Sequence, residues 1–102
     1  MKITYQIVYW RDIPAQLRFR NERERFSKKL SSRFQEAIDE AAMRARTTGA
    51  DEYLEDWRTS EWLSAKGDPQ QQAEAVVIEL EAAYSLERLE GLVSSQGYET
   101  LP

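Results

Sequence analysis

The chain has 102 residues and a formal net charge of −4, and it contains neither cysteine nor histidine. This composition excludes disulfide bonds, metal and haem sites that depend on Cys or His ligands, and Cys–His or Ser–His–Asp catalysis. The length and the 41% share of hydrophobic residues favour one globular domain over residues 1–102.

The first elements are predicted to be two strands. Residues 2–10, KITYQIVYW, alternate between two faces and are rich in β-branched and aromatic side chains, which is typical of a strand. The segment 11–14 should interrupt it, because its proline cannot donate to a ladder. We expect a second strand to start near Ala15, with Leu17 and Phe19 on one face.

Residues 21–31 allow two interpretations, and the pattern alone leaves both open. As a helix, the segment would place apolar side chains at every fourth position from Phe26. As a strand, residues 22–30 would follow a two-residue turn at Asn21-Glu22, which places Leu17 opposite Phe26.

The rest of the chain is predicted to be mainly helical. Ser32 and Gln35 have the spacing of a capping box, so a helix should begin at Ser32. The remaining expected elements are the end of that helix before Gly49, a short helix over 51–57, a strand over 58–65, a helix from Pro69 capped by Asp68, and a last helix after Ser85. This order favours an α+β fold, with a small antiparallel sheet of three to four strands and three to four helices packed on one face.

A first group of candidate binding residues combines tryptophan with arginine. It comprises Trp10, Arg11, Asp12 and Gln16 around the end of the first strand, and Trp57 and Arg58 at a helix–strand junction. Trp and Arg are enriched in interaction hot spots, so the two pairs could form one aromatic–cationic surface. The competing interpretation is that both tryptophans fill the core and the arginines pair with acidic groups.

A second group lies in the basic half of the chain. Residues 1–47 carry 11 Lys and Arg against 6 Asp and Glu, whereas residues 48–102 carry 3 against 12. The candidate binding residues in this half are Arg18, Arg20, Arg23 and Arg25. In the strand interpretation, Arg20 faces Arg23 and Arg18 faces Arg25, on the side opposite Leu17 and Phe26.

These arginines need a counter-charge, and three sources are conceivable. The acidic half of the chain is the first, and an acidic or phosphorylated partner is the second. A nucleic acid is disfavoured, because the sequence pI is about 4.9 and no nucleic-acid motif is present. The carboxylates fall mainly on polar helix faces, so we assign no catalytic residue.

Three blocks of the sequence resemble a known family. They are Tyr9-Trp10-Arg11-Asp12-Ile13-Pro14-Ala15-Gln16, then residues 33–45 beginning Arg33-Phe34-Gln35, and Asp51 through Tyr53-Leu54-Glu55-Asp56-Trp57-Arg58. Together, over residues 3–94, they resemble the bacterial family of small domains named "virulence factor". A similar domain forms the C-terminal part of conserved virulence factor C-type proteins.

The resemblance implies a context but no catalytic residue. Similar free-standing proteins tend to be encoded beside genes of folate and cobalamin one-carbon metabolism. They often carry Gly near position 21 or 22 and Pro near position 31, which favours the strand interpretation of residues 22–30.

We therefore expect a non-enzymatic binding or accessory module that acts through a protein partner, such as a one-carbon or methyl-transfer enzyme, without a metal or cofactor. The alternative is a small-ligand-binding or enzyme-associated domain that recognises an anionic metabolite such as a folate. The N-terminal residues resemble no signal peptide, and no apolar run is long enough to span a membrane, which favours a cytoplasmic protein without a membrane partner.

Overall fold

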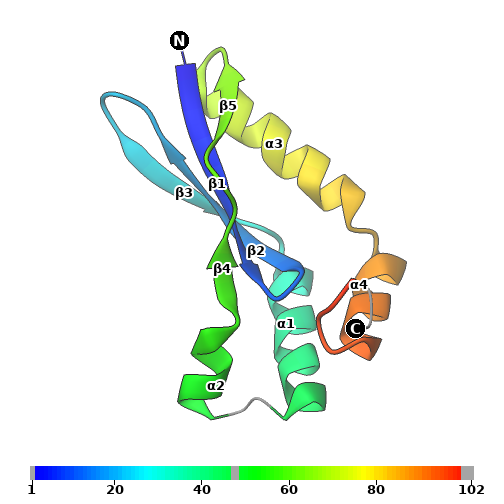
Figure 1. Cartoon of the computed structure of the whole chain (residues 1–102). Coiled ribbons are helices and arrows are strands. Elements are labelled where there is room, and N and C mark those ends of the chain that lie inside the picture. Colours follow the sequence, from blue (N-terminus) through cyan, green and yellow to red (C-terminus); the bar gives the residue numbers. More distant parts are fainter. Residues whose placement is uncertain (1, 47–48, 100–102) are drawn as a thin grey trace.

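The computed structural model describes residues 2–46 and 49–99, and within them the chain forms five strands and four helices (Figure 1). In chain order these are β1 (Lys2–Trp10), β2 (Ile13–Arg20), β3 (Arg25–Lys29), α1 (Ser32–Ala45), α2 (Ala50–Glu55), β4 (Trp57–Thr59), β5 (Leu63–Lys66), α3 (Pro69–Ala83) and α4 (Leu86–Ser94).

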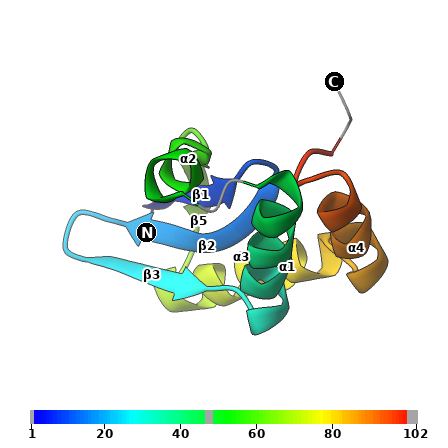
Figure 2. The ribbon, with the colours of Figure 1, turned by 90° about the horizontal axis from the view of Figure 1, so that it is seen from below.

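The strands form one antiparallel sheet in the order β3-β2-β1-β4. β5 pairs with the first half of β1 and β4 pairs with its last residues, so the two short strands share one edge of β1. Figure 2 shows α1, α3 and α4 on one side of the sheet, with α2 apart from them, and Figure 1 shows that α2 leads directly into β4. The expected α+β class is confirmed.

The core lies between the sheet and these helices. The last residues of β2 alternate between buried and exposed because strand residues alternate between two faces, and Ile3, Leu17 and Phe19 are almost completely buried. α1 contributes its apolar stripe, which includes Phe34 and Ile38. This face of the sheet is therefore covered. The other face is mixed, because Gln6, Val8 and Trp10 of β1 are buried there, whereas Arg18 and Arg20 of β2 are exposed.

The second strand starts two residues earlier than the sequence predicts. β2 begins at Ile13 and includes Pro14, which is buried and lies opposite Tyr9. The β1–β2 register shifts between Val8 and Tyr9. Proline is tolerated in a strand at such an irregularity, where a regular ladder bond is absent. The expectation that Pro14 lies before the second strand is therefore wrong.

The helical interpretation of residues 22–30 is wrong, and the strand interpretation is right with a different register. Phe19, rather than Leu17, lies opposite Phe26, and the two rings stack with 5.1 Å between centroids. The turn is longer than two residues because the Asn21 side-chain oxygen accepts hydrogen bonds from the backbone N–H groups of Arg23 and Glu24, both at 2.8 Å. The register is consequently displaced by two residues.

The predicted capping box at Ser32 is also wrong. The N-cap of α1 is Ser31, whose side chain makes no capping bond and donates instead to Glu81 Oε1 at 2.6 Å. Gln35 donates to Asp39 within the helix. A contact between distant segments thus replaces the expected local one. The caps predicted for the later helices are confirmed, since Asp68 accepts from the Gln71 N–H and Ser85 accepts from the Arg88 N–H.

The single strand expected over residues 58–65 is divided into β4 and β5. At the break, Ser60 exchanges backbone and side-chain hydrogen bonds with Ile7, because its N–H donates to the Ile7 carbonyl and its Oγ accepts from the Ile7 N–H. Trp62 falls between the two strands and is exposed. In the part of the chain that the structure describes, no helix is long and apolar enough to cross a membrane.

Candidate functional site

Both Trp–Arg pairs meet where β1 ends, as the sequence allowed. Trp10 lies opposite Trp57 in the β1–β4 ladder, so Arg11 and Arg58 are brought to the same end of the sheet. We call this set the junction; it comprises Trp10, Arg11, Asp12, Asp56, Trp57 and Arg58.

Arg11 is bound on all sides at the junction. Its guanidinium donates to Asp56 Oδ2 at 3.2 Å and to the Gln96 carbonyl at 2.7 Å. It also lies over the rings of Trp10 and Tyr98, at 4.8 and 4.7 Å from their centroids. Only 11% of the side chain is exposed. The group is therefore used in holding the C-terminal segment against α2 and the sheet.

Arg58 and Asp12 form a second internal connection. Arg58 Nε donates to the Arg11 carbonyl at 2.9 Å, and its NH2 group donates to Asp12 Oδ1 at 3.0 Å. The other oxygen of Asp12 accepts the Glu99 N–H at 2.8 Å. Each Asp12 oxygen thus accepts a hydrogen bond from within the chain.

Two tyrosines beside the junction have altered acidity. Burial raises the pKa of the Tyr9 hydroxyl above its ordinary value of 10.0, although the nearby Arg58 charge opposes the change. Burial likewise raises the pKa of Tyr84. The Arg88 guanidinium stacks on Tyr84 at 3.9 Å and pairs with Glu99. These contacts stabilise the packing of α4 and give no group suited to acid–base catalysis near neutral pH.

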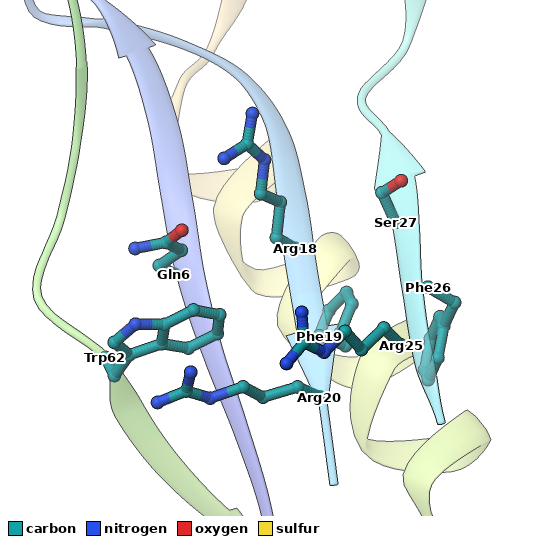
Figure 3. A pocket seen from close by; sticks show the side chains of 8 residues that line it. All are labelled: Gln6, Arg18, Phe19, Arg20, Arg25, Phe26, Ser27 and Trp62. Atoms are coloured by element: carbon teal, nitrogen blue, oxygen red, sulfur yellow. The ribbon is translucent and has the colours of Figure 1, made fainter. Parts of the chain in front are cut away.

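The other group of candidates lies at the opposite end of the sheet and is open. A pocket of about 330 Å³ lies over the face of the sheet away from the core (Figure 3), and its lining side chains come from three strands and the loop before β5. We call it the hairpin pocket; it is lined by Gln6, Arg18, Phe19, Arg20, Arg25, Phe26, Ser27 and Trp62.

The register explains why the arginines gather there. Gln6 pairs with Arg18, Arg18 pairs with Ser27, and Arg20 pairs with Arg25, so these side chains share one face of neighbouring strands. Figure 3 shows Arg18 and Arg20 projecting from β2 and Arg25 reaching from β3 toward β2. All three arginines are exposed.

Their charges are not neutralised within the described ranges 2–46 and 49–99, where Arg18, Arg20 and Arg25 form no ion pair. Arg20 stacks on the Trp62 ring at 3.7 Å and makes one weak contact, 3.4 Å, with Thr4 Oγ1. The pairing with the acidic half of the chain that we considered is made by Arg33 instead, with Glu81 at 3.7 Å.

The remaining candidates lie outside both places. Arg23 is exposed in the β2–β3 turn and does not line the hairpin pocket. Gln16 lies opposite Val8 and Lys29 and lines a separate pocket with Trp57. Sequence reasoning did not single out Gln6, Ser27 or Trp62 as site residues. Strand alternation could have found Gln6, which shares a face with Arg18.

Comparison with known proteins identifies one family. A family model described as "Virulence factor" matches residues 8–93. Among curated proteins and among solved structures, none matches the chain. The match covers the junction and the whole hairpin pocket except Gln6.

Proposed function

The chain belongs to the virulence-factor family, and we propose that it is a non-enzymatic binding module that recognises an acidic segment of a protein partner through the hairpin pocket. The observation that carries this proposal is the group of Arg18, Arg20 and Arg25, exposed on one open face without a carboxylate partner in the described structure. Arginine forks bind carboxylates through two parallel hydrogen bonds, which suits an acidic partner.

The energetics of the sheet support this assignment. Arg20 directly faces Arg25, and like charges opposite each other destabilise a ladder. An arrangement that costs stability without an internal counter-ion fits a surface that is neutralised on binding. Trp62 adds an exposed aromatic ring beside the arginines, and Trp with Arg is the composition of interaction hot spots.

A one-carbon or methyl-transfer enzyme is the partner that the sequence resemblance favours, and it stays a prediction. The second candidate function, binding of an anionic metabolite such as a folate, is favoured by one observation. The pocket volume of about 330 Å³ reaches the lower end of the range typical of small-ligand sites.

Thermal unfolding with different anions tests the proposal. At equal ionic strength, sulfate should raise the Tm more than chloride does, because anions that bind only the folded protein stabilise it. The double variant Arg18→Gln/Arg25→Gln should lose the difference. The matched control Arg23→Gln/Arg44→Gln removes two exposed charges outside the pocket and should keep it. Equal sulfate effects in all three proteins would contradict the proposal.

The same assay separates the two candidates. Folic acid is added in place of sulfate, and hexaglutamate peptide is added in a parallel series. A Tm increase with the peptide that Arg18→Gln/Arg25→Gln abolishes supports the binding of acidic protein segments. A Tm increase with folic acid but none with the peptide would favour an anionic metabolite as the ligand of the hairpin pocket.

A further inference from the structure

The outer edge of β3 borders the hairpin pocket. β3 pairs with β2 on one side and is the last strand of the sheet order in the described structure. An edge strand presents unpaired N–H and C=O groups that can pair with another chain.

Two hydrogen bonds define the phase of this ladder. The Asn21 N–H donates to the Glu24 carbonyl at 3.0 Å, and the Leu30 N–H donates to the Ala15 carbonyl at 3.2 Å. In an antiparallel pair, directly opposed residues alternate between bonded and non-bonded pairs. The pairs Asn21–Glu24 and Ala15–Leu30 are therefore bonded pairs, and so are Phe19–Phe26 and Leu17–Lys28 between them. Phe26 and Lys28 thus direct their backbone groups toward β2.

The backbone groups of Arg25, Ser27 and Lys29 are consequently directed away from β2. The side chains of the same three residues lie on the open face, because they pair with Arg20, Arg18 and Gln16. Two of the three residues, Arg25 and Lys29, therefore combine outward backbone groups with a cationic side chain on the open face. Phe26, which is half-buried, turns its side chain to the other face, where it stacks on Phe19.

We infer that the β3 edge takes up an extended acidic segment of the partner as an added antiparallel strand. The inference rests on the proposed function and specifies how the partner binds. The residues of the segment opposite Arg25, Ser27 and Lys29 would bond their backbone groups and place acidic side chains beside Arg18 and Arg25. The alternate residues would face Phe26 and be apolar. Main-chain bonds supply affinity in this mode, and alternate side chains supply specificity.

Charge complementarity favours an acidic segment over a second copy of the chain. An antiparallel β3–β3 pair centred on Ser27 would place Arg25 opposite Lys29 twice, and like charges opposite each other are destabilising. Cationic edge strands commonly prevent such self-association. An acidic strand reverses the sign of this effect at the same positions.

A designed peptide tests the inference with the protein unchanged. The probe is acetyl-(Glu-Val)₃-amide, and ¹⁵N NMR titration gives both its affinity and the amides it perturbs. One analogue is N-methylated at the three Glu residues and another at the three Val residues. Because the Glu N–H groups would face β3, methylating them should weaken binding at least about tenfold, as expected when several hydrogen bonds are lost. Methylating Val should leave binding nearly unchanged. The amides of Arg25, Ser27 and Lys29 should gain protection from hydrogen exchange.

A protein variant gives a second, independent readout. Ser27→Pro removes an N–H that the fold does not use, which edge strands tolerate, and Ser27→Thr is the matched control that keeps it. Proline should weaken peptide binding about tenfold, whereas threonine should have little effect. The NMR spectrum of each free variant shows whether it is folded.

The outcomes separate this inference from the proposed function. If the peptide binds and Arg18→Gln/Arg25→Gln abolishes binding, but both N-methylated analogues bind equally, the acidic partner stands and strand addition is wrong. If the peptide does not bind at all, both proposals fail.

Discussion

The two ends of the sheet use arginine in opposite ways. At the junction, Arg11 and Arg58 are bound to Asp56, Asp12 and backbone carbonyls. At the hairpin pocket, Arg18 and Arg25 have no ion pair within the described residues. The same side chain is a structural connection at one end and a free cation at the other, and the difference lies in what the neighbouring segments supply.

This contrast shows that a conspicuous sequence motif can belong to the internal packing of the fold. The Trp–Arg pairs are adjacent in the sequence and have the composition of interaction anchors, yet Trp10 and Arg11 are almost completely buried and Arg58, half exposed, bonds Asp12 and the Arg11 carbonyl. The hairpin arginines are spread over two strands and meet only through the register. Which arginine remains free is decided by tertiary packing.

The largest expected difference between the two ends concerns their tryptophans. Trp10 is fully buried and donates its Nε1–H to the Tyr53 carbonyl at 3.1 Å. Trp10→Ala should cost about 3–5 kcal/mol of unfolding free energy, as a large core truncation does. Trp62 is 38% exposed, and Trp62→Ala should cost about 1 kcal/mol or less, the scale of an exposed cation–π contact. Urea denaturation measures both, and similar costs would contradict the account of the two ends.

The arginines should differ in the same direction by a smaller amount. Arg11→Ala removes two charge-assisted hydrogen bonds from a nearly buried site and should cost about 1.5–3 kcal/mol. Backbone strain at this position, where φ is 53°, is the same for alanine, so the change reports the side chain. Arg18→Ala should stay within about 0.5 kcal/mol of the parent, as exposed substitutions do.

A double variant shows whether the Arg11 effect comes from its ion pair. Arg11→Ala combined with Asp56→Ala should cost less than the sum of the two single changes, because the two residues interact directly. Full additivity would indicate that the pair contributes little.

The smallest of these effects is a loss of stability at alkaline pH that originates beside the junction. The pKa values of Tyr9 and Tyr84 are raised in the folded protein, mainly by burial. The unfolded chain therefore releases these protons first, so the stability they contribute is complete below the ordinary value of 10.0 and is lost as pH rises through the folded pKa. Unfolding free energies at pH 8.5 and pH 11 should differ less for Tyr9→Phe/Tyr84→Phe than for the parent. An equal loss of unfolding free energy in both proteins would show that the two tyrosines do not cause it.

Local patterns predicted much of the fold. The alternation of residues 2–10, the caps Asp68 and Ser85 and the apolar stripe of α1 all depend on near neighbours in the chain, and the structure has them. The errors occur where a distant or less regular contact decides. The Ser31 hydroxyl donates a hydrogen bond to Glu81 instead of capping α1. Ser60 bonds Ile7 and so interrupts the strand that the sequence predicts over 58–65.

The candidate site at the hairpin pocket was harder to predict than the fold, because it depends on the strand register. The two-residue turn at Asn21-Glu22 placed Arg18 opposite Arg25, whereas the longer turn places Arg20 there. The grouping of these arginines on one face was nevertheless predictable, since a displacement of two residues keeps the face of every side chain. The approach of Trp62 was not, since it follows from the break between β4 and β5.

The most direct test of the contrast observes the guanidinium groups themselves. In ¹⁵N NMR spectra of the arginine Nε–H groups, titration with sulfate at constant ionic strength should shift the signals of Arg18 and Arg25. The signal of Arg11 should remain fixed, and its Nε–H should exchange slowly with solvent because it is bonded to Asp56. Equal responses from Arg11 and Arg18, or fixed signals for Arg18 and Arg25, would contradict the account that the arginines at one end of the sheet are held by internal partners and those at the other end are free to bind.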